Sequence, residues 1–186
     1  MKQVHRLREI LSRHADLGGA LRGSRLHQLC LLEREVGIFS GERSWLRAAL
    51  TSCRRVVAGQ STYVRRDEVL LLVANLELRL DHGERAADAA MDLLRTYPRS
   101  GLRCAALLLR AKVAQAAGTG RASVGPKGLL RRAYRAVFAA PSCQRSAARE
   151  ERIQAHYSWA WALIRAGQPG SGERELRQLL RSERLN

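Results

Sequence analysis

The residues with the clearest potential for chemistry are cations that have no acidic neighbours. Residues 93–149 contain no Asp or Glu, but they contain 12 Lys and Arg side chains. Five of these cations fall on two stripes of helical spacing: Lys127, Arg131 and Arg135, and before them Arg103 and Arg110. Guanidinium groups bind carboxylates and phosphates through a planar fork of donors. The stretch therefore predicts a surface for an anionic partner.

Three kinds of partner carry such charge, namely acidic protein segments, nucleic acids and anionic lipids. Binding of RNA or DNA strands also needs aromatic rings on which bases stack. The stretch offers only Tyr97, Tyr134 and Phe138, and two of these are expected in the core. We therefore expect an acidic or amphipathic segment of another protein, with RNA or DNA as the alternative. A solvated surface remains a third interpretation, because 30 of the 33 cations are Arg and a biased composition alone gives the net charge of +16.

Aromatic residues near the C-terminus predict a second part of the binding surface. The expected helix within residues 144–166 has two apolar stripes, one with Tyr157 and Trp161 and the other with His156 and Trp159. Inner helices of a stack pack on two faces, so both stripes fit a core. Alternatively, one stripe is exposed, since Trp and Tyr are enriched at binding hot spots. In that case we expect Trp161 to contact the partner.

No pattern in the sequence indicates catalysis, a metal site or a cofactor. The five histidines are dispersed, and neither H-E-x-x-H nor G-x-S-x-G occurs. The four cysteines are far apart and lack C-x-x-C spacing, which argues against zinc: Cys30, Cys53, Cys104 and Cys143. Because each lies among Leu and Ala on an expected helix, we predict buried, reduced thiols in a reducing compartment.

Helical hairpins must position these residues. Apolar residues recur at helical spacing along the whole chain, Pro is scarce, and Gly-centred turns separate the periodic segments. We predict a single domain over residues 1–186, with a capping helix followed by four hairpins: 1–20, then about 24–59, 63–98, 100–140 and 144–184. The Gly-rich residues 118–128 are expected to form a mobile loop inside the third hairpin.

The hairpins resemble those of the tetratricopeptide (TPR) class of α-helical repeats. In that class a small residue on the first helix faces a small residue on the second, and a proline often follows. Ala74 and Ala86 are 12 residues apart with Pro98 another 12 on, and Ala160 and Gly172 repeat the offset. The period is about 42 rather than the usual 34. The resemblance implies an all-α, right-handed α-α superhelix that acts as a non-catalytic interaction scaffold or adaptor.

Composition also bears on location. The longest apolar runs are far shorter than the roughly 20 residues of a membrane span, and the N-terminal residues are charged throughout. We therefore expect a cytoplasmic protein. A regulatory subunit of a catalytic protein fits the same observations as a scaffold does, and the sequence leaves the oligomeric state open.

Overall fold

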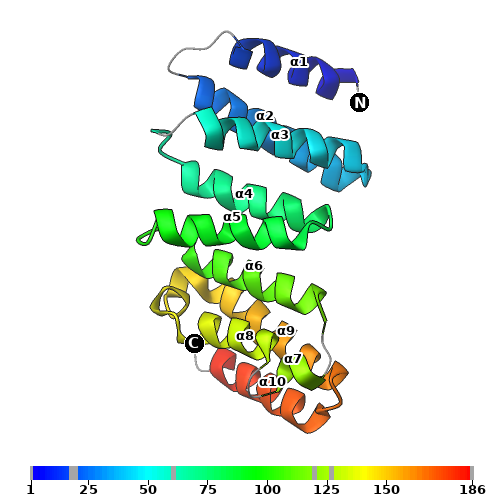
Figure 1. The fold of residues 1–186 in the computed structure, drawn as a ribbon, viewed down its shortest axis with the longest axis vertical. Coiled ribbons are helices and arrows are strands. Elements are labelled where there is room, and N and C mark those ends of the chain that lie inside the picture. The colour runs from blue at the N-terminus through cyan, green and yellow to red at the C-terminus, as the bar shows by residue number, and fades with distance from the viewer. Residues whose placement is uncertain (1, 17–20, 60–61, 119–120, 126–127, 185–186) are drawn as a thin grey trace. The chain divides into compact units, whose positions relative to one another are not determined.

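The chain folds into helices that form two compact units (Figure 1). The computed structural model describes residues 2–16, 21–59, 62–118, 121–125 and 128–184, and these residues contain no strand. Unit 1 is Met1–Leu93 and unit 2 is Leu94–Asn186. The single domain expected from the sequence stays a prediction.

Unit 1 is a series of antiparallel helices in which neighbours in sequence pack together, as α2 does on α3 and α3 on α4. Its helices are α1 (Lys2–Asp16), α2 (Arg22–Ser40), α3 (Arg43–Gly59), α4 (Arg66–Arg79) and most of α5 (Gly83–Thr96). Leu26, Val56, Val69 and Leu76 are completely buried between them. The boundaries of the capping helix and of the hairpins stay predictions, and residues 1 and 17–20 of the expected capping helix lie outside the described part.

Unit 2 packs around the buried Tyr134, which contacts Trp159 with a ring-centroid separation of 5.4 Å. Its elements are α6 (Arg103–Ala116), α7 (Arg121–Val124), α8 (Leu129–Ala139), the 3₁₀ turns η1 (Pro141–Cys143) and η2 (Ser146–Ala148), α9 (Arg149–Arg165) and α10 (Pro169–Arg184). Helix α6 packs on α8, and α9 packs on α10, as expected for the third and fourth hairpins.

The connection between α6 and α8 differs from the predicted mobile loop. It contains the helical turn α7, whose Val124 is fully buried in the core of unit 2. The Nε of Arg131 donates a hydrogen bond of 3.1 Å to the carbonyl oxygen of Val124. Burial of the Val124 side chain and the hydrogen bond to its carbonyl oxygen thus hold this segment against α8. Residues 119–120 and 126–127, also part of the predicted loop, lie outside the described residues.

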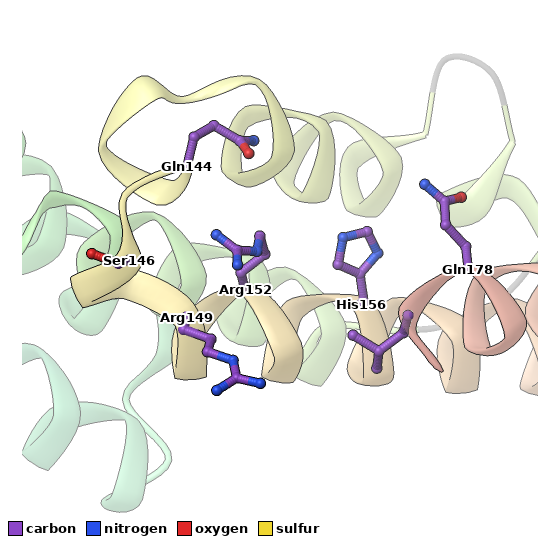
Figure 2. Close-up of a pocket in the computed structure, with 7 residues that line it drawn as sticks. Gln144, Ser146, Arg149, Arg152, His156 and Gln178 are labelled. Atoms are coloured by element: carbon purple, nitrogen blue, oxygen red, sulfur yellow. The ribbon is translucent and has the colours of Figure 1, made fainter. Parts of the chain in front are cut away.

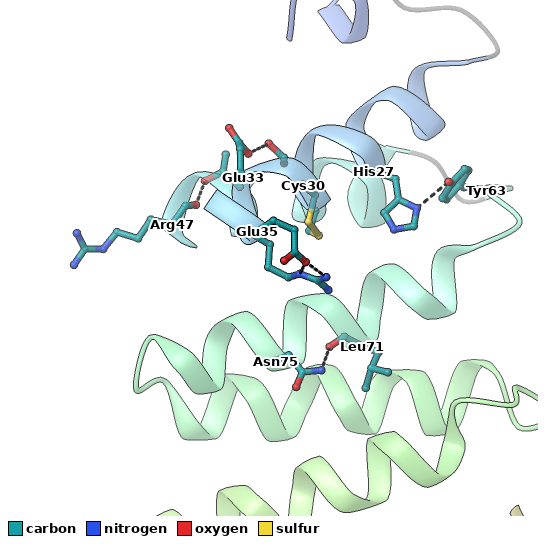
Figure 3. The surroundings of a disulfide bond; sticks show 12 residues. His27, Cys30, Glu33, Glu35, Arg47, Tyr63, Leu71 and Asn75 are labelled. Carbon is teal, nitrogen blue, oxygen red and sulfur yellow. Dashed lines mark hydrogen bonds and ion pairs between the residues drawn. A yellow bond between two sulfur atoms is a disulfide. The ribbon is translucent and has the colours of Figure 1, made fainter. Parts of the chain in front are cut away.

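The cysteines correct the prediction of reduced thiols, because all four form disulfide bonds. Cys30 of α2 pairs with Cys53 of α3, next to the hydrogen bond between His27 and Tyr63 (Figure 3). Cys104 of α6 pairs with Cys143 of η1. The prediction was wrong because distance in sequence does not measure distance across a hairpin. Packing of the helices brings the Cα atoms within 5.3 Å and 4.9 Å of each other, inside the range that a disulfide spans.

The predicted small-residue pair of the last hairpin is a close backbone contact between α9 and α10. A Cβ atom placed on Gly172 would lie 2.6 Å from the carbonyl oxygen of Ala160 and 2.6 Å from Cγ1 of Ile164. In the second hairpin, Ala74 and Ala86 are both fully buried. At Gly172 only glycine fits without displacing a neighbouring backbone.

We expect the substitution Gly172→Ala to lower the free energy of unfolding by about 2 kcal/mol, the scale of an overpacked core. Gly170→Ala on the same helix is the matched control, because a Cβ there has nothing within 4 Å. Both variants lose the same glycine freedom in the unfolded chain, so their difference isolates the contact. Urea unfolding followed by circular dichroism measures it. Equal stability of the two variants would contradict the close approach.

Candidate partner-binding surface

Helix α9 exposes one aromatic stripe and buries the other. The side chains of Tyr157 and Trp161 are 52% and 40% exposed, and their rings meet edge to face with centroids 6.2 Å apart. Trp159 is only 6% exposed, and Leu163 is also buried. The alternative that the sequence left open, an exposed stripe on this helix, is therefore the Tyr157–Trp161 stripe.

Contacts with α8 explain this orientation. Ala160 faces the backbone of α10, and its two neighbours, Trp159 and Trp161, are rotated from it by about 100° in opposite directions. The ring of Trp159 contacts Tyr134 and lies below the guanidinium of Arg131, both on α8. Tyr157 lies one turn before Trp161 on the other side of α9. The packing of α8 thus determines which aromatic side chains of α9 reach solvent.

Helix α6 contributes to the same region of unit 2. The Nζ of Lys112 donates a hydrogen bond of 3.2 Å to Oε1 of Gln154, which precedes Tyr157 by three residues on α9. The predicted site residue Arg110 is half-buried on α6, two positions before Lys112. It is rotated by about 200° around the helix from Lys112 and therefore lies on another side of α6. We define the α6–α9 face as Lys112, Gln154, Tyr157 and Trp161. Lys112 and Gln154 were not predicted as site residues. Gln154 could have been found from the sequence, because it precedes Tyr157 by three residues and so lies beside it on a helix.

The other predicted cations lie elsewhere, and two of them support the fold. An Nη of Arg103 donates 3.0 Å to the carbonyl oxygen of Leu94, in the last turn of α5, where the carbonyls lack helical partners. Arg131 bonds Val124 and places its guanidinium 6.0 Å from the centre of the Trp159 ring. These contacts account for the positions of both side chains within the fold, without a partner protein. Lys127 lies outside the described residues.

Arg135 is exposed on α8 and lines a small hollow together with Arg131. The hollow measures about 200 Å³, and its remaining lining residues are Tyr134, Phe138, Trp159 and Glu175. The predicted stripe therefore brings Arg131 and Arg135 together, but the hollow is too small for a folded segment. The six predicted residues that the structure describes lie on several helices and not in one hollow, and the roles of all seven stay predictions.

The buried phenol of Tyr134 is poorly suited to act as a base. Burial raises the pKa of Tyr134 to about 12, and its hydroxyl donates a hydrogen bond of 2.7 Å to Oε1 of Gln115. A phenol with this pKa stays neutral at physiological pH and cannot act as a base. Within the described ranges, no group of His, Cys, Asp or Glu has an arrangement that could hold a metal ion.

No protein-family model matches the chain, and no curated protein is significantly similar to it in sequence. Its structure is similar to the crystal structure of MamA, a TPR-like helical protein, with a TM-score of 0.66 and 14% sequence identity. The alignment covers 97% of this chain and 86% of MamA. The all-α, TPR-like fold predicted from the sequence is thus confirmed. The period of about 42 residues stays a prediction.

Proposed function

We propose that the chain is a non-catalytic scaffold or adaptor that binds an acidic or amphipathic segment of a partner protein on the α6–α9 face. The observation that carries the proposal is the half-exposed pair of Tyr157 and Trp161 on a helix that buries its other aromatic stripe. The TPR-like fold supports a scaffold in general, because extended helical repeats present long surfaces for partners.

The chemistry of the face suits an amphipathic helix or an extended acidic peptide. Tyr157 and Trp161 offer apolar area with little side-chain freedom to lose, which is typical of hot-spot residues. Lys112 lies on the adjacent helix within the stretch that has no acidic residues. A partner helix would place apolar side chains on the aromatic pair and carboxylates over α6. The complementary charge would mainly speed association and select the partner.

The test is binding of a purified partner, first identified by cross-linking in native cells and mass spectrometry. We expect the double substitution Tyr157→Ala/Trp161→Ala to weaken the affinity for the partner about 30-fold or more. This is the effect of losing a hot spot of at least about 2 kcal/mol. Reversal of charge at Lys112 should slow association, and it avoids Arg103 and Arg131, which support the fold. Isothermal titration calorimetry and surface plasmon resonance measure the two effects.

Phe39→Ala serves as the matched control, because Phe39 is an aromatic residue that is 95% exposed on α2 of unit 1. Its loss should leave the partner's affinity unchanged. If the control weakens binding as much as the double substitution does, or if neither changes it, the partner binds elsewhere and the proposal for this face fails.

Nucleic-acid binding is the second candidate, and the net charge of +16 with the acid-free stretch favours it. However, Tyr134 is fully buried, and Phe138 is half-buried and stacked on His156 at 4.4 Å, so neither ring offers a free face for bases. This candidate predicts that generic RNA or DNA binds with an affinity that falls steeply as salt increases. A flat response in a salt series would remove it.

The disulfide bonds also bear on the compartment. Among the described residues, no helix combines the length and the hydropathy needed to cross a membrane. Buried disulfides are typical of proteins in oxidising compartments. They therefore count against the cytoplasmic location expected from the sequence, which relied on reduced thiols.

A further inference from the structure

A second hollow in unit 2 lies at the start of α9 and is more polar than the α6–α9 face. It measures about 650 Å³ and is open to solvent. Figure 2 shows Arg152 and His156 extending from α9 toward Gln144. Its walls are the connection between α8 and α9, the first half of α9, and α10. We call it the Arg149–Arg152 hollow. Its lining residues are Gln144, Ser146, Arg149, Arg152, His156, Gln178 and Leu179.

The lining is cationic and rich in hydrogen-bond donors. Arg149, Arg152 and His156 are spaced i, i+3 and i+7, which places them on one stripe of α9. The lining includes two amides and a hydroxyl, but no Asp or Glu. Glu150 and Glu151 of the same helical turn are not lining residues. The nearest carboxylate in contact with the lining is that of Glu175, which lies 3.1 Å from Nδ1 of His156.

Several contacts hold these side chains before any ligand arrives. Arg152 donates a hydrogen bond of 3.3 Å to the carbonyl oxygen of Cys143, and Gln144 donates one of 2.7 Å to that of Phe138. The His156 ring stacks on Phe138. The disulfide between Cys143 and Cys104 attaches this wall to α6. A guanidinium has five N–H donors, so the bond to Cys143 orients Arg152 and leaves most of its donor capacity for a ligand.

We propose that the Arg149–Arg152 hollow binds an oxyanion, the phosphate or carboxylate group of a small polar ligand. Arg side chains recognise both groups through paired donors, and amide and hydroxyl groups complete such sites. The N-terminal end of the 17-residue helix α9 adds partial positive charge. The volume is within the range of small-molecule sites, about 300 to 1,000 Å³. Leu179 is the one aliphatic side chain among the seven lining residues, which argues against a hydrophobic ligand.

This site is separate from the proposed partner surface. On α9 the stripe of Arg149, Arg152 and His156 is rotated by well over 90° from the stripe of Tyr157 and Trp161, given about 100° per residue. A ligand in the hollow therefore need not compete with a partner on the α6–α9 face. Binding to either site can be measured while the other is empty.

The experiment is isothermal titration calorimetry of the full, disulfide-bonded chain with inorganic phosphate, pyrophosphate and citrate. Sodium chloride holds the ionic strength constant, so that non-specific screening does not change. We expect saturable binding with a dissociation constant of about 1 mM or tighter for at least one anion. Preference for pyrophosphate would identify a phosphate-bearing ligand, and preference for citrate a carboxylate-bearing one.

Arg149→Gln and Arg152→Gln should each weaken the affinity for the preferred anion about tenfold or more, as expected for a lost charge-assisted hydrogen bond. Arg165→Gln, an exposed arginine at the other end of α9, is the control and should bind like the unmodified chain. If Arg152→Gln does not fold, Arg149→Gln and Gln178→Ala, both at exposed positions, provide the same test. Absence of saturable binding up to about 10 mM, or equal weakening by Arg165→Gln, would overturn the proposal.

Discussion

Removal of both disulfide bonds is expected to unfold most of the chain at room temperature. Cys30 and Cys53 are separated by 23 residues, and Cys104 and Cys143 by 39. Closing loops of these lengths in the unfolded chain corresponds to about 3 to 4 kcal/mol for each bond. Two bonds together approach the whole stability of a typical domain, about 5 to 15 kcal/mol.

Paired substitutions separate the two contributions. Cys30→Ala/Cys53→Ala should destabilise unit 1, and Cys104→Ala/Cys143→Ala should destabilise unit 2, each by about 3 kcal/mol in urea unfolding. Alanine avoids a buried hydroxyl, which serine would introduce at positions that are at most 1% exposed. The substitutions Cys104→Ala/Cys143→Ala should also weaken anion binding in the Arg149–Arg152 hollow, because the disulfide bond of Cys143 holds its wall in place.

Thiol titration gives an independent check on the bonds themselves. The folded chain should show no reactive thiol, since all four sulfurs are buried. The informative measurement is made in denaturant without reductant: disulfide-bonded chains still show none, whereas reduced chains show four. Four thiols in protein purified without reductant would contradict both bonds and would restore the prediction of a reducing compartment.

The hairpins could be predicted because their causes are local. Apolar residues at helical spacing define the faces that must be buried, and Pro98 and Pro141 end periodic segments. The predicted hairpin at 63–98 accordingly contains α4 and α5. The small-residue spacing between Ala160 and Gly172 also predicted a real close approach.

The sequence repeats one motif at three different structural positions. The Gly-Glu-Arg triplet begins at Gly41, which has a left-handed φ of 73° after α2. It also begins at Gly83, the first residue of α5, and at Gly172 inside α10. In the second hairpin the left-handed residue is Asp81, with φ 66°. Asp tolerates this conformation better than most residues do, so glycine spacing alone does not identify the left-handed residue of each turn.

The candidate site was only partly predictable, because exposure depends on contacts between helices. Both stripes of α9 are apolar in sequence, and the contact of Trp159 with Tyr134 of α8 buries Trp159, whereas Trp161 is exposed. In the same way, a list of cations does not reveal that Arg103 and Arg131 donate to backbone carbonyls. Such contacts join residues from different helices, and no periodicity along one helix indicates them.

Glu77 illustrates the same difficulty and leads to the second large effect. It lies on α4 among Val73, Ala74 and Leu76 and is only 1% exposed. Its carboxylate accepts a hydrogen bond from Arg54 of α3, and Nδ1 of His82 lies 2.8 Å from its other oxygen. The pair with Arg54 therefore joins two consecutive hairpins of unit 1.

Arg54→Ala is expected to lower the free energy of unfolding by about 3 kcal/mol, because it leaves a buried carboxylate without its main counter-charge. Arg54 itself is half-exposed, so little of this loss comes from its own burial. Arg47→Ala removes an exposed arginine from the same helix and should change stability by no more than about 0.5 kcal/mol. Urea unfolding of the two variants measures the difference.

The double variant Arg54→Ala/Glu77→Leu distinguishes a buried charge from a general packing defect. If the loss arises from the unpaired carboxylate, replacing Glu77 by a leucine of similar size should recover most of it, since apolar residues often substitute for buried ion pairs without loss of stability. Recovery would give a large coupling energy in the double-mutant cycle. Additive losses, or an Arg54→Ala variant as stable as Arg47→Ala, would show that Glu77 does not depend on Arg54 and that the hairpins are joined by their apolar contacts alone.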